Sequence, residues 1–131
     1  MEIGICRENG IFMHERRIYM QLRFKKSGAT LVVTLDGDLD HHNAVTVREE
    51  IDSKFISTKA KNLVFNLSKL KFMDSSGLGI LIGRYKAVSA IGGQTIIAQP
   101  TPSSRRLIIL SGIHKIIPIY KTLDEALGGA I

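Results

Sequence analysis

The feature that most constrains the fold of this chain is a repeated succession of short apolar runs and segments with helical periodicity. Three such runs occur, at residues 29–37 (ATLVVTLDG), 62–67 (NLVFNL) and 94–99 (QTIIAQ). After each run, apolar residues recur at a spacing of three or four, which is typical of a helix with one buried face. Strands that alternate with helices in this way predict an α/β domain with a mainly parallel sheet.

Two of the predicted helices have clear boundaries. The first is expected to begin with Asp40 as its N-cap and to end near Ser57, and the second to begin with Asp74 as its N-cap. Gly92 and Gly93 provide the C-terminal stop of the second helix. The predicted apolar stripes are Ala44, Val47, Ile51 and Phe55 in the first helix, and Leu78, Leu81, Ile82, Tyr85 and Val88 in the second.

The C-terminal third of the chain continues the pattern. Thr101 or Ser103 can cap a short helix after the third run. Residues Lys115–Tyr120 are predicted as a last short strand, at an edge of the sheet because Pro118 has no N–H to donate. The segment TLDEAL then carries a capping box, which predicts a final helix.

The segment before the first apolar run is expected to pair with that run as an antiparallel strand. Gln21–Lys26 alternates apolar and polar residues, and Ser27 and Gly28 provide a turn, which predicts a hairpin with the first run. We therefore predict one α/β domain, in which a mixed, mainly parallel sheet of about four to five strands packs against about four helices. A length of 131 residues suits one core and is too short for two.

The net charge of +6 raises the question of nucleic-acid binding. The cations are dispersed, however, with only pairs such as Lys25–Lys26 and Arg105–Arg106, and no aromatic residues are interleaved with them. A basic surface of this kind suits an acidic protein partner instead. Cys6 is the only cysteine, so no internal disulfide can form, and no apolar run reaches the roughly 18 residues of a membrane span. We expect a cytoplasmic protein without a membrane or direct nucleic-acid partner.

The stretch KFMDSSGLGILIGRYK, Lys71–Lys86, places an acid, two hydroxyls and a glycine where a strand pattern gives way to a helical one. In open sheets, functional residues gather beyond the carboxyl ends of parallel strands, and Asp36–His42 occupies a second position of this kind. Catalysis by Ser75 is not expected. The nucleophile elbow Gly-x-Ser-x-Gly has Met73 in place of its first glycine here, and nothing in the sequence pairs a histidine with the serine.

A phosphate cradle is a further alternative. Gly77, Gly79 and Gly83 fall one residue off the dinucleotide fingerprint, and the chain has no Gly-Lys-Ser/Thr of a P-loop. We expect these glycines to permit close packing of the helix on the sheet. Even so, a helix N-terminus with Ser75 and Ser76 would attract an anion, so a small nucleotide- or phosphate-binding regulatory domain remains the alternative function.

Metal binding is not expected from the segment LDGDLDHH. Taken as a calcium loop from Asp36, it has His41 where glycine is needed and Val47 where a bidentate glutamate is needed. We interpret Asp-Gly-Asp as a turn at Gly37, and the adjacent His41 and His42 point in different directions in a first helical turn. We therefore predict no metal and no other cofactor.

The remaining interpretation treats Ser75 as a modification site. Asp74 caps the helix, and Ser75 and Ser76 lie in its first turn, where N–H groups are expected to be free and the helix dipole favours negative charge. A phosphate on Ser75 would add about −1.5 to −2 charges. The fold would stand, whereas a partner that docks over this corner would meet a bulky anion beside Asp74.

Four segments carry a resemblance to a known family: GDLDHHNA, NLSKLKFMDSSGLGILIGRYK, IGGQ and RRLIILSGIHKIIPIY. In order and spacing, from about Met20 to the C-terminus, they resemble the STAS-domain anti-sigma factor antagonists, most closely those of the sporulation sigma-F system. Residues 1–19 have no counterpart in the short family members. The expected division is an N-terminal extension at 1–19, as a regulatory arm, a disordered tail or a misassigned start, and a STAS domain at 20–131.

The resemblance implies a regulatory cycle rather than an enzyme. The unmodified antagonist would bind a dimeric anti-sigma factor that is also an ATP-dependent serine kinase, and would so release the sigma factor for transcription. The kinase would phosphorylate Ser75, and a manganese- or magnesium-dependent PP2C-type phosphatase would remove the phosphate. The positions implied for the docking face are Asp38, Asp40, His41, Asp74, Ser76, Gly77 and Leu78.

Overall fold

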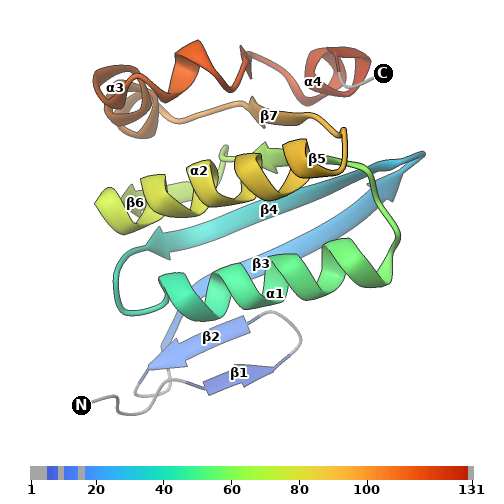
Figure 1. The fold of residues 1–131 in the computed structure, drawn as a ribbon. Helices are drawn as coiled ribbons and strands as arrows, with labels where there is room; N and C mark the ends of the chain where they lie inside the picture. Colours follow the sequence, from blue (N-terminus) through green and yellow to red (C-terminus); the bar gives the residue numbers. More distant parts are fainter. Residues whose placement is uncertain (1–5, 9–10, 15–16, 130–131) are drawn as a thin grey trace.

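In the part of the chain that the computed structural model describes, residues 6–8, 11–14 and 17–129, eight strands form one mixed sheet that carries four α-helices (Figure 1). The strands are β1 (Cys6–Glu8), β2 (Ile11–His14), β3 (Arg17–Ser27), β4 (Thr30–Leu39), β5 (Asn62–Asn66), β6 (Leu70–Met73), β7 (Thr95–Ala98) and β8 (Ile119–Tyr120). The helices are α1 (Ala44–Ser57), α2 (Ser75–Ala90), α3 (Pro102–Ser111) and α4 (Leu123–Gly129), with a 3₁₀ turn η1 (Ile113–Lys115).

The sheet has the strand order β1-β2-β3-β4-β5-β7-β8, and β6 pairs with the last part of β4, beyond the part that pairs with β5. Neighbours from β1 to β4 are antiparallel, whereas β4 with β5, β4 with β6, β5 with β7 and β7 with β8 are parallel. The mixed α/β fold predicted from the sequence is confirmed, and β1, β2 and β6 come in addition to the predicted strands.

The central strand β4 explains why both faces of the sheet are covered. Successive side chains of a strand point to opposite faces. Leu31, Val33 and Leu35 are buried in the larger core, under α1, α2 and α3. Val32 is buried in a smaller core on the other face, together with Ala126 of α4. The alternation of β4 therefore divides the interior into two layers.

The helices α1 and α2 lie side by side over one face of the sheet (Figure 1). They are joined by an ion pair in which Arg84 Nε lies 2.8 Å from Asp52 Oδ1. Beneath them, Val47, Ile51 and Leu81 are fully buried in the larger core. Both helices begin at the end of the sheet where β4 finishes, so this packing fixes their first turns close to one another.

The predicted turn at Gly37 is wrong, because β4 continues through this residue to Leu39. Gly37 has φ +132°, and the pairing of β4 with β6 shifts register between Gly37 and Asp38. Glycine adopts this conformation without strain, and it marks a bulge at the point where β4 takes β6 as its neighbour in place of β5. The sequence does not predict β6, because Lys71 and Phe72 are both exposed and the strand lacks alternation.

The predicted helices are confirmed in the middle of the chain. The helix α1 ends as expected, and α2 ends at Ala90, shortly before Gly92 with φ +80°. Thr101 rather than Ser103 caps α3, because its side chain accepts the Ser104 N–H at 3.3 Å.

The last predicted strand, Lys115–Tyr120, is wrong in extent, because only the two residues of β8 pair with β7. The N–H groups of Ile116 and Ile117 both donate to the Ile113 carbonyl, at 3.0 Å and 2.9 Å, so the chain turns here through η1 and does not form an extended strand. The predicted cap of the final helix is confirmed, since Thr122 Oγ1 accepts the Glu125 N–H at 3.1 Å.

The described part of residues 1–19 forms β1, β2 and the start of β3. These strands extend the sheet on the far side of β3 by antiparallel pairing (Figure 1). A division of the chain into an extension at 1–19 and a domain at 20–131 stays a prediction.

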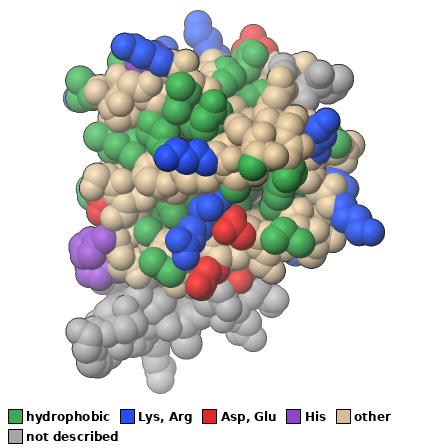
Figure 2. All heavy atoms as spheres, in the orientation of Figure 1, with side chains coloured by type: hydrophobic (Ala, Val, Ile, Leu, Met, Phe, Trp, Pro, Cys, Tyr) green, Lys and Arg blue, Asp and Glu red, His purple; other side chains and the backbone are tan. Residues whose placement is uncertain are grey.

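The charged side chains are dispersed over the visible surface. Figure 2 shows Lys and Arg side chains spread over the visible face rather than gathered into one patch. The histidine side chains at the left of this view mark the end of the sheet at which α1 and α2 begin. None of the helices in the described ranges is both long and apolar enough to cross a membrane.

Candidate functional site

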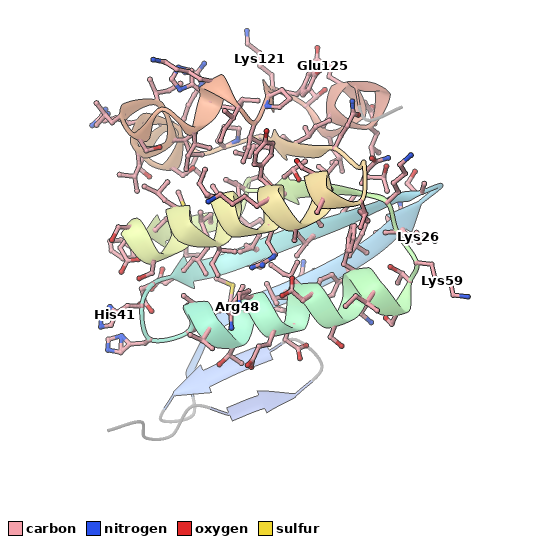
Figure 3. All side chains as sticks on the ribbon, in the orientation of Figure 1. Lys26, His41, Arg48, Lys59, Lys121 and Glu125 are labelled. Atoms are coloured by element: carbon pink, nitrogen blue, oxygen red, sulfur yellow. The ribbon has the colours of Figure 1, made fainter. Side chains whose placement is uncertain are left out.

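The predicted site residues lie in or beside two loops, the loop from β4 to α1 and the short loop from β6 to α2. These two loops meet at one end of the sheet. The strands β4 and β6 are parallel neighbours with Leu39 opposite Met73, and the Asp74 N–H donates to the Leu39 carbonyl at 3.3 Å. The residues that follow the two strands therefore lie side by side, as expected at the carboxyl ends of parallel strands. Figure 3 shows His41 at this end, in the loop between β4 and α1.

Asp74 caps α2, as the sequence predicts. Its backbone is extended, with φ −109° and ψ −167°, and one carboxylate oxygen accepts the Ser76 N–H at 2.8 Å. Its carbonyl accepts the Gly77 N–H at 3.0 Å and the Leu78 N–H at 3.3 Å. A carboxylate at this position satisfies an N–H group at the start of the helix and complements the helix dipole.

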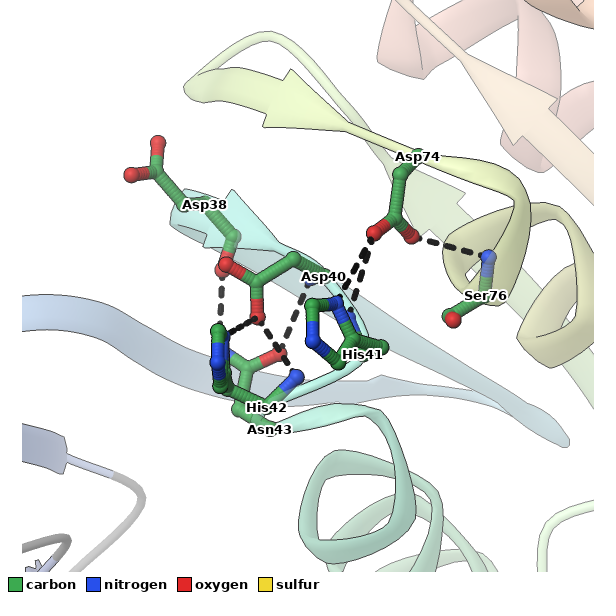
Figure 4. Close-up of polar contacts among 7 residues, drawn as sticks. All are labelled: Asp38, Asp40, His41, His42, Asn43, Asp74 and Ser76. Carbon is green, nitrogen blue, oxygen red and sulfur yellow. Dashed lines mark hydrogen bonds and ion pairs between the residues drawn. The ribbon is translucent and has the colours of Figure 1, made fainter. Parts of the chain in front are cut away.

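The second carboxylate oxygen of Asp74 contacts the other loop. It accepts the His41 N–H at 3.2 Å, and His41 Nδ1 lies 3.6 Å from it (Figure 4). Burial alone would raise the pKa of the Asp74 carboxyl, but the N–H groups of Ser76, His41 and Gly77 and the His41 ring together hold this pKa below its ordinary value. Asp74 is therefore an ionised bridge between the two loops.

A different set of contacts fixes the loop after β4. Asn43 is fully buried, its Oδ1 accepts the Asp40 N–H at 3.1 Å, and its Nδ2 donates to the Asp38 carbonyl at 2.8 Å. Asp40 Oδ1 in turn accepts the His42 N–H at 2.9 Å. The prediction that Asp40 caps the helix is wrong, because a turn intervenes: Asp40 closes this turn, and Asn43 occupies the N-cap position of α1.

Asn43 is a residue that the sequence analysis misses. Burying an amide costs free energy unless its donor and its acceptor are both paired, and here both are. A signal for it exists in the sequence, since a polar amide stands directly before Ala44, the first residue of the apolar stripe. Asn43 positions the loop that carries Asp40 and His41.

Ser75 is the first residue of α2 and is exposed, whereas Ser76 is half-buried. The expectation of free N–H groups in this turn is wrong for Ser76, Gly77 and Leu78, because all three N–H groups donate to Asp74. An anion on Ser75 would therefore meet the favourable end of the helix dipole and also a carboxylate beside it. The same engagement weakens the case for a phosphate or nucleotide cradle at this helix start.

Gly77 lets α2 begin close to the ends of β4 and β6. A Cβ added at this position would overlap Met73 Cγ, and would lie 2.9 Å from Met73 Sδ and 3.2 Å from Leu39 Cδ2. Only glycine fits without a shift of these side chains. At Gly79 and Gly83 nothing lies within 4 Å of an added Cβ, so the expectation that these two glycines serve close packing is wrong.

The remaining predicted site residues, Asp38 and Leu78, lie beside the contacts between Asp74 and His41. The Asp38 carboxylate points away from it in Figure 4, and Leu78 is half-buried against the larger core. The rings of His41 and His42 are exposed, with centroids 4.0 Å apart. Within the described ranges, no group of three or more His, Cys, Asp or Glu side chains is arranged to hold a metal ion.

The fold and the corner can be compared with known proteins. Residues 21–126 match the family model of the STAS domain. The chain therefore belongs to the STAS domain family. It is 38% identical over 108 residues to an anti-sigma F factor antagonist of Paenibacillus polymyxa, and the alignment covers 82% of this chain and 92% of that protein.

Two solved structures, each 30% identical to this chain, support the same grouping. The anti-sigma factor antagonist SpoIIAA in its unphosphorylated form aligns with a TM-score of 0.72 over 82% of this chain and 94% of that chain. The Bacillus cell fate determinant SpoIIAA in the phosphorylated form aligns with a TM-score of 0.66 over 84% of this chain and 99% of that chain. The family resemblance found in the sequence is confirmed, and this group consists of regulatory proteins rather than enzymes.

Proposed function

We propose that this chain is an anti-sigma factor antagonist. In its unphosphorylated form it binds an anti-sigma factor that is also a serine kinase, and this binding frees a sigma factor, sigma-F of sporulation, for transcription. The 38% identity to the Paenibacillus polymyxa anti-sigma F factor antagonist supports this choice of partner. The similarity to SpoIIAA, whose structures represent an unphosphorylated and a phosphorylated form, supports control by phosphorylation.

The observation that carries the proposal is the exposure of Ser75 directly after the cap Asp74. A kinase must bring the acceptor hydroxyl in line with the γ-phosphate of ATP, which requires an accessible side chain. Ser75 meets this requirement at the end of the sheet where the two loops converge. We propose that the kinase phosphorylates Ser75 and that a PP2C-type phosphatase removes the phosphate.

The kinase contacts a docking face made of both loops. Its proposed members are Asp38, Asp40, His41, Asp74, Ser76, Gly77 and Leu78. The Asp74 carboxylate accepts the His41 N–H, so a partner that contacts one loop also acts on the other. Gly77 is buried and contributes by its close approach to Met73, whereas the half-buried Leu78 offers apolar surface beside Ser75.

The proposed switch is electrostatic. A phosphate on Ser75 adds about −1.5 to −2 charges next to the Asp74 carboxylate, whose lowered pKa keeps it ionised near neutral pH. The N–H groups of Ser76, Gly77 and Leu78 are engaged with Asp74, so they do not neutralise the phosphate. A kinase surface shaped for the unmodified corner then meets like charge, at a cost on the order of a few kcal/mol.

The proposal places the protein in the cytoplasm, where ATP-dependent kinases and sigma factors act together. It includes no cofactor, no membrane and no direct nucleic-acid partner. The effect on transcription is therefore indirect, through the sigma factor that the kinase releases.

Mass spectrometry of the full chain after incubation with the cognate anti-sigma kinase and ATP tests the modification site. We expect one phosphate, on Ser75, in the wild type. Ser75→Ala should receive none, and the matched control Ser53→Ala, at an exposed serine of α1 outside the docking face, should be phosphorylated like the wild type. Persistent absence of phosphate from the wild type, or its presence on Ser76 alone, would overturn the assignment.

Titration of the kinase with unmodified variants tests the electrostatic mechanism. Ser75→Ala should bind as tightly as the wild type, and Ser75→Asp should bind at least tenfold more weakly, a loss of about 1.4 kcal/mol. Ser53→Asp, the same charge change at an exposed position of α1, is the control and should bind normally. Equal affinity of Ser75→Asp and the wild type would show that charge is not the cause of release.

A further inference from the structure

A groove separate from the proposed docking face lies between β6 and α3. Its volume is about 340 Å³. The lining residues that matter are Lys71, Phe72 and Met73 of β6, and Arg106, Leu107 and Leu110 of α3. Figure 2 shows hydrophobic side chains at the surface beside α3, toward the left of the view. Nothing in the proposed phosphorylation cycle uses this groove.

One wall of the groove is an open edge of the sheet. Within the described residues, β6 pairs with β4 alone, so its other edge faces the groove. An edge strand presents N–H and C=O groups that can pair with a strand of another chain. The neighbouring strands β5 and β7 differ, because each has a partner on both sides.

Apolar and cationic side chains surround this edge. Phe72 is 53% exposed and Leu110 is 78% exposed, which is high for large apolar residues, and Leu107 is half-buried. Lys71 and Arg106 are exposed, and none of the described residues that line the groove is acidic. An apolar site with cations that no acid opposes favours a ligand that is both apolar and anionic.

We propose that the groove binds an extended acidic segment of a protein partner, which adds to β6 as a further strand. In strand addition, main-chain hydrogen bonds provide affinity, and alternate side chains provide specificity. Apolar side chains of the segment contact Phe72, Leu107 and Leu110. Its Asp or Glu side chains, on the alternate positions, pair with Lys71 and Arg106.

The groove and the phosphorylation corner share a strand. Met73 ends β6, and Asp74 follows it directly. A partner protein that contacts Ser75 could therefore place an acidic segment along β6 at the same time. The inference itself rests on the open edge and the lining, and it holds whether or not Ser75 is phosphorylated.

Selection of random octapeptides on the full chain tests the groove. We expect enrichment of peptides in which Asp or Glu alternates with apolar residues. Their affinity should fall at least tenfold for Leu110→Ser and for Arg106→Glu. The matched controls are Ile56→Ser, at a side chain that is 74% exposed on α1, and Lys59→Glu, and both should bind like the wild type. Thermal unfolding verifies that these surface variants fold.

Amide spectra of the full chain locate the bound peptide. The largest shifts should fall on residues 71–73 and 106–110, and the β6 amides should exchange more slowly with the peptide bound. Failure to enrich acidic peptides, equal binding by the groove variants, or a helical bound peptide would each overturn the inference. Binding of phosphatidylglycerol vesicles that is lost in the groove variants, with no peptide selected, would assign the groove to a membrane and would also overturn it.

Discussion

The two corners at which a strand leads into a long helix, from β4 to α1 and from β6 to α2, are built in different ways. At the first corner, the buried Asn43 holds the backbone of Asp38 and Asp40 from inside the protein. At the second corner, Asp74 holds the first turn of the helix from its partly exposed carboxylate, and Ser75 remains exposed.

This difference suits the second corner, rather than the first, to the proposed phosphorylation. A buried polar group with all its partners in place is costly to disturb, so the first corner stays in one conformation. An exposed hydroxyl such as Ser75 can gain a phosphate without entering the core. Because Asp74 also contacts His41, a charge added at the second corner acts on the loop of the first.

The largest effect on stability should come from a side chain added at Gly77, where α2 packs closely against Met73. Gly77→Ala should lower the free energy of unfolding by about 2–3 kcal/mol, because the added Cβ overlaps Met73. Gly79→Ala is the matched control on the exposed side of the same helix and should raise this free energy by up to about 1 kcal/mol. Urea unfolding measures both variants, and equal behaviour would contradict the close approach at Gly77.

Removal of the buried amide should weaken the first corner. Asn43→Ala should cost about 2 kcal/mol, because the Asp40 N–H and the Asp38 carbonyl lose their partner. His42→Ala, in the same loop but exposed, should change the free energy of unfolding by less than about 0.5 kcal/mol. Guanidinium unfolding distinguishes them, and a cost for Asn43→Ala as small as that of the control would remove its supporting role.

Loss of the helix cap should have a smaller effect that depends on pH. Asp74→Ala should cost about 1 kcal/mol at pH 7. Since the pKa of Asp74 is lowered by folding, its contribution is complete above the unfolded value of about 3.9 and is lost as the pH falls through the folded value. The difference between wild type and variant should therefore shrink below about pH 4.

The control for the cap is Asp38→Ala, because the Asp38 carboxylate points away from the corner. Unfolding of Asp74→Ala, Asp38→Ala and the wild type is measured from pH 7 to pH 3. A cost of Asp74→Ala that stayed constant over this range would mean that the ionised carboxylate is not what stabilises α2.

The smallest effect should come from Ser75, the proposed phosphorylation site. Ser75→Ala should change the free energy of unfolding by less than about 0.5 kcal/mol, because its side chain is exposed. Thermal unfolding of the variant measures this change. A loss of more than about 1 kcal/mol would identify the hydroxyl as part of the fold rather than as a free acceptor for phosphate.

Local signals in the sequence predict the second corner well. The acid before the serines predicts the cap of α2, and the structure has this cap on Asp74. The same local reasoning fails at the first corner, where Asp40 looks like a cap. Whether the helix starts at Asp40 or three residues later depends on Asn43, whose two hydrogen bonds exist only when the loop is folded back on β4.

Features that depend on which strands are neighbours in the sheet also cannot be predicted from the sequence. Gly37 resembles a turn residue, but in the sheet it marks the point where β4 changes partner from β5 to β6. The strand β6 lacks an apolar alternation because the consecutive residues Lys71 and Phe72 are both exposed, although successive side chains of a strand point to opposite faces. Neither property can be inferred from spacing along the chain.

A phosphate on Ser75 is expected to change the surface of the second corner and to leave the first corner and the core intact. Calorimetric titration of the anti-sigma kinase with the fully phosphorylated and the unmodified chain measures the effect on binding, and an amide spectrum of each form measures the effect on structure. We expect at least a tenfold loss of affinity, and shifts confined to residues 74–78 and the His41 loop. Unchanged affinity, or shifts spread through the core, would contradict this expectation.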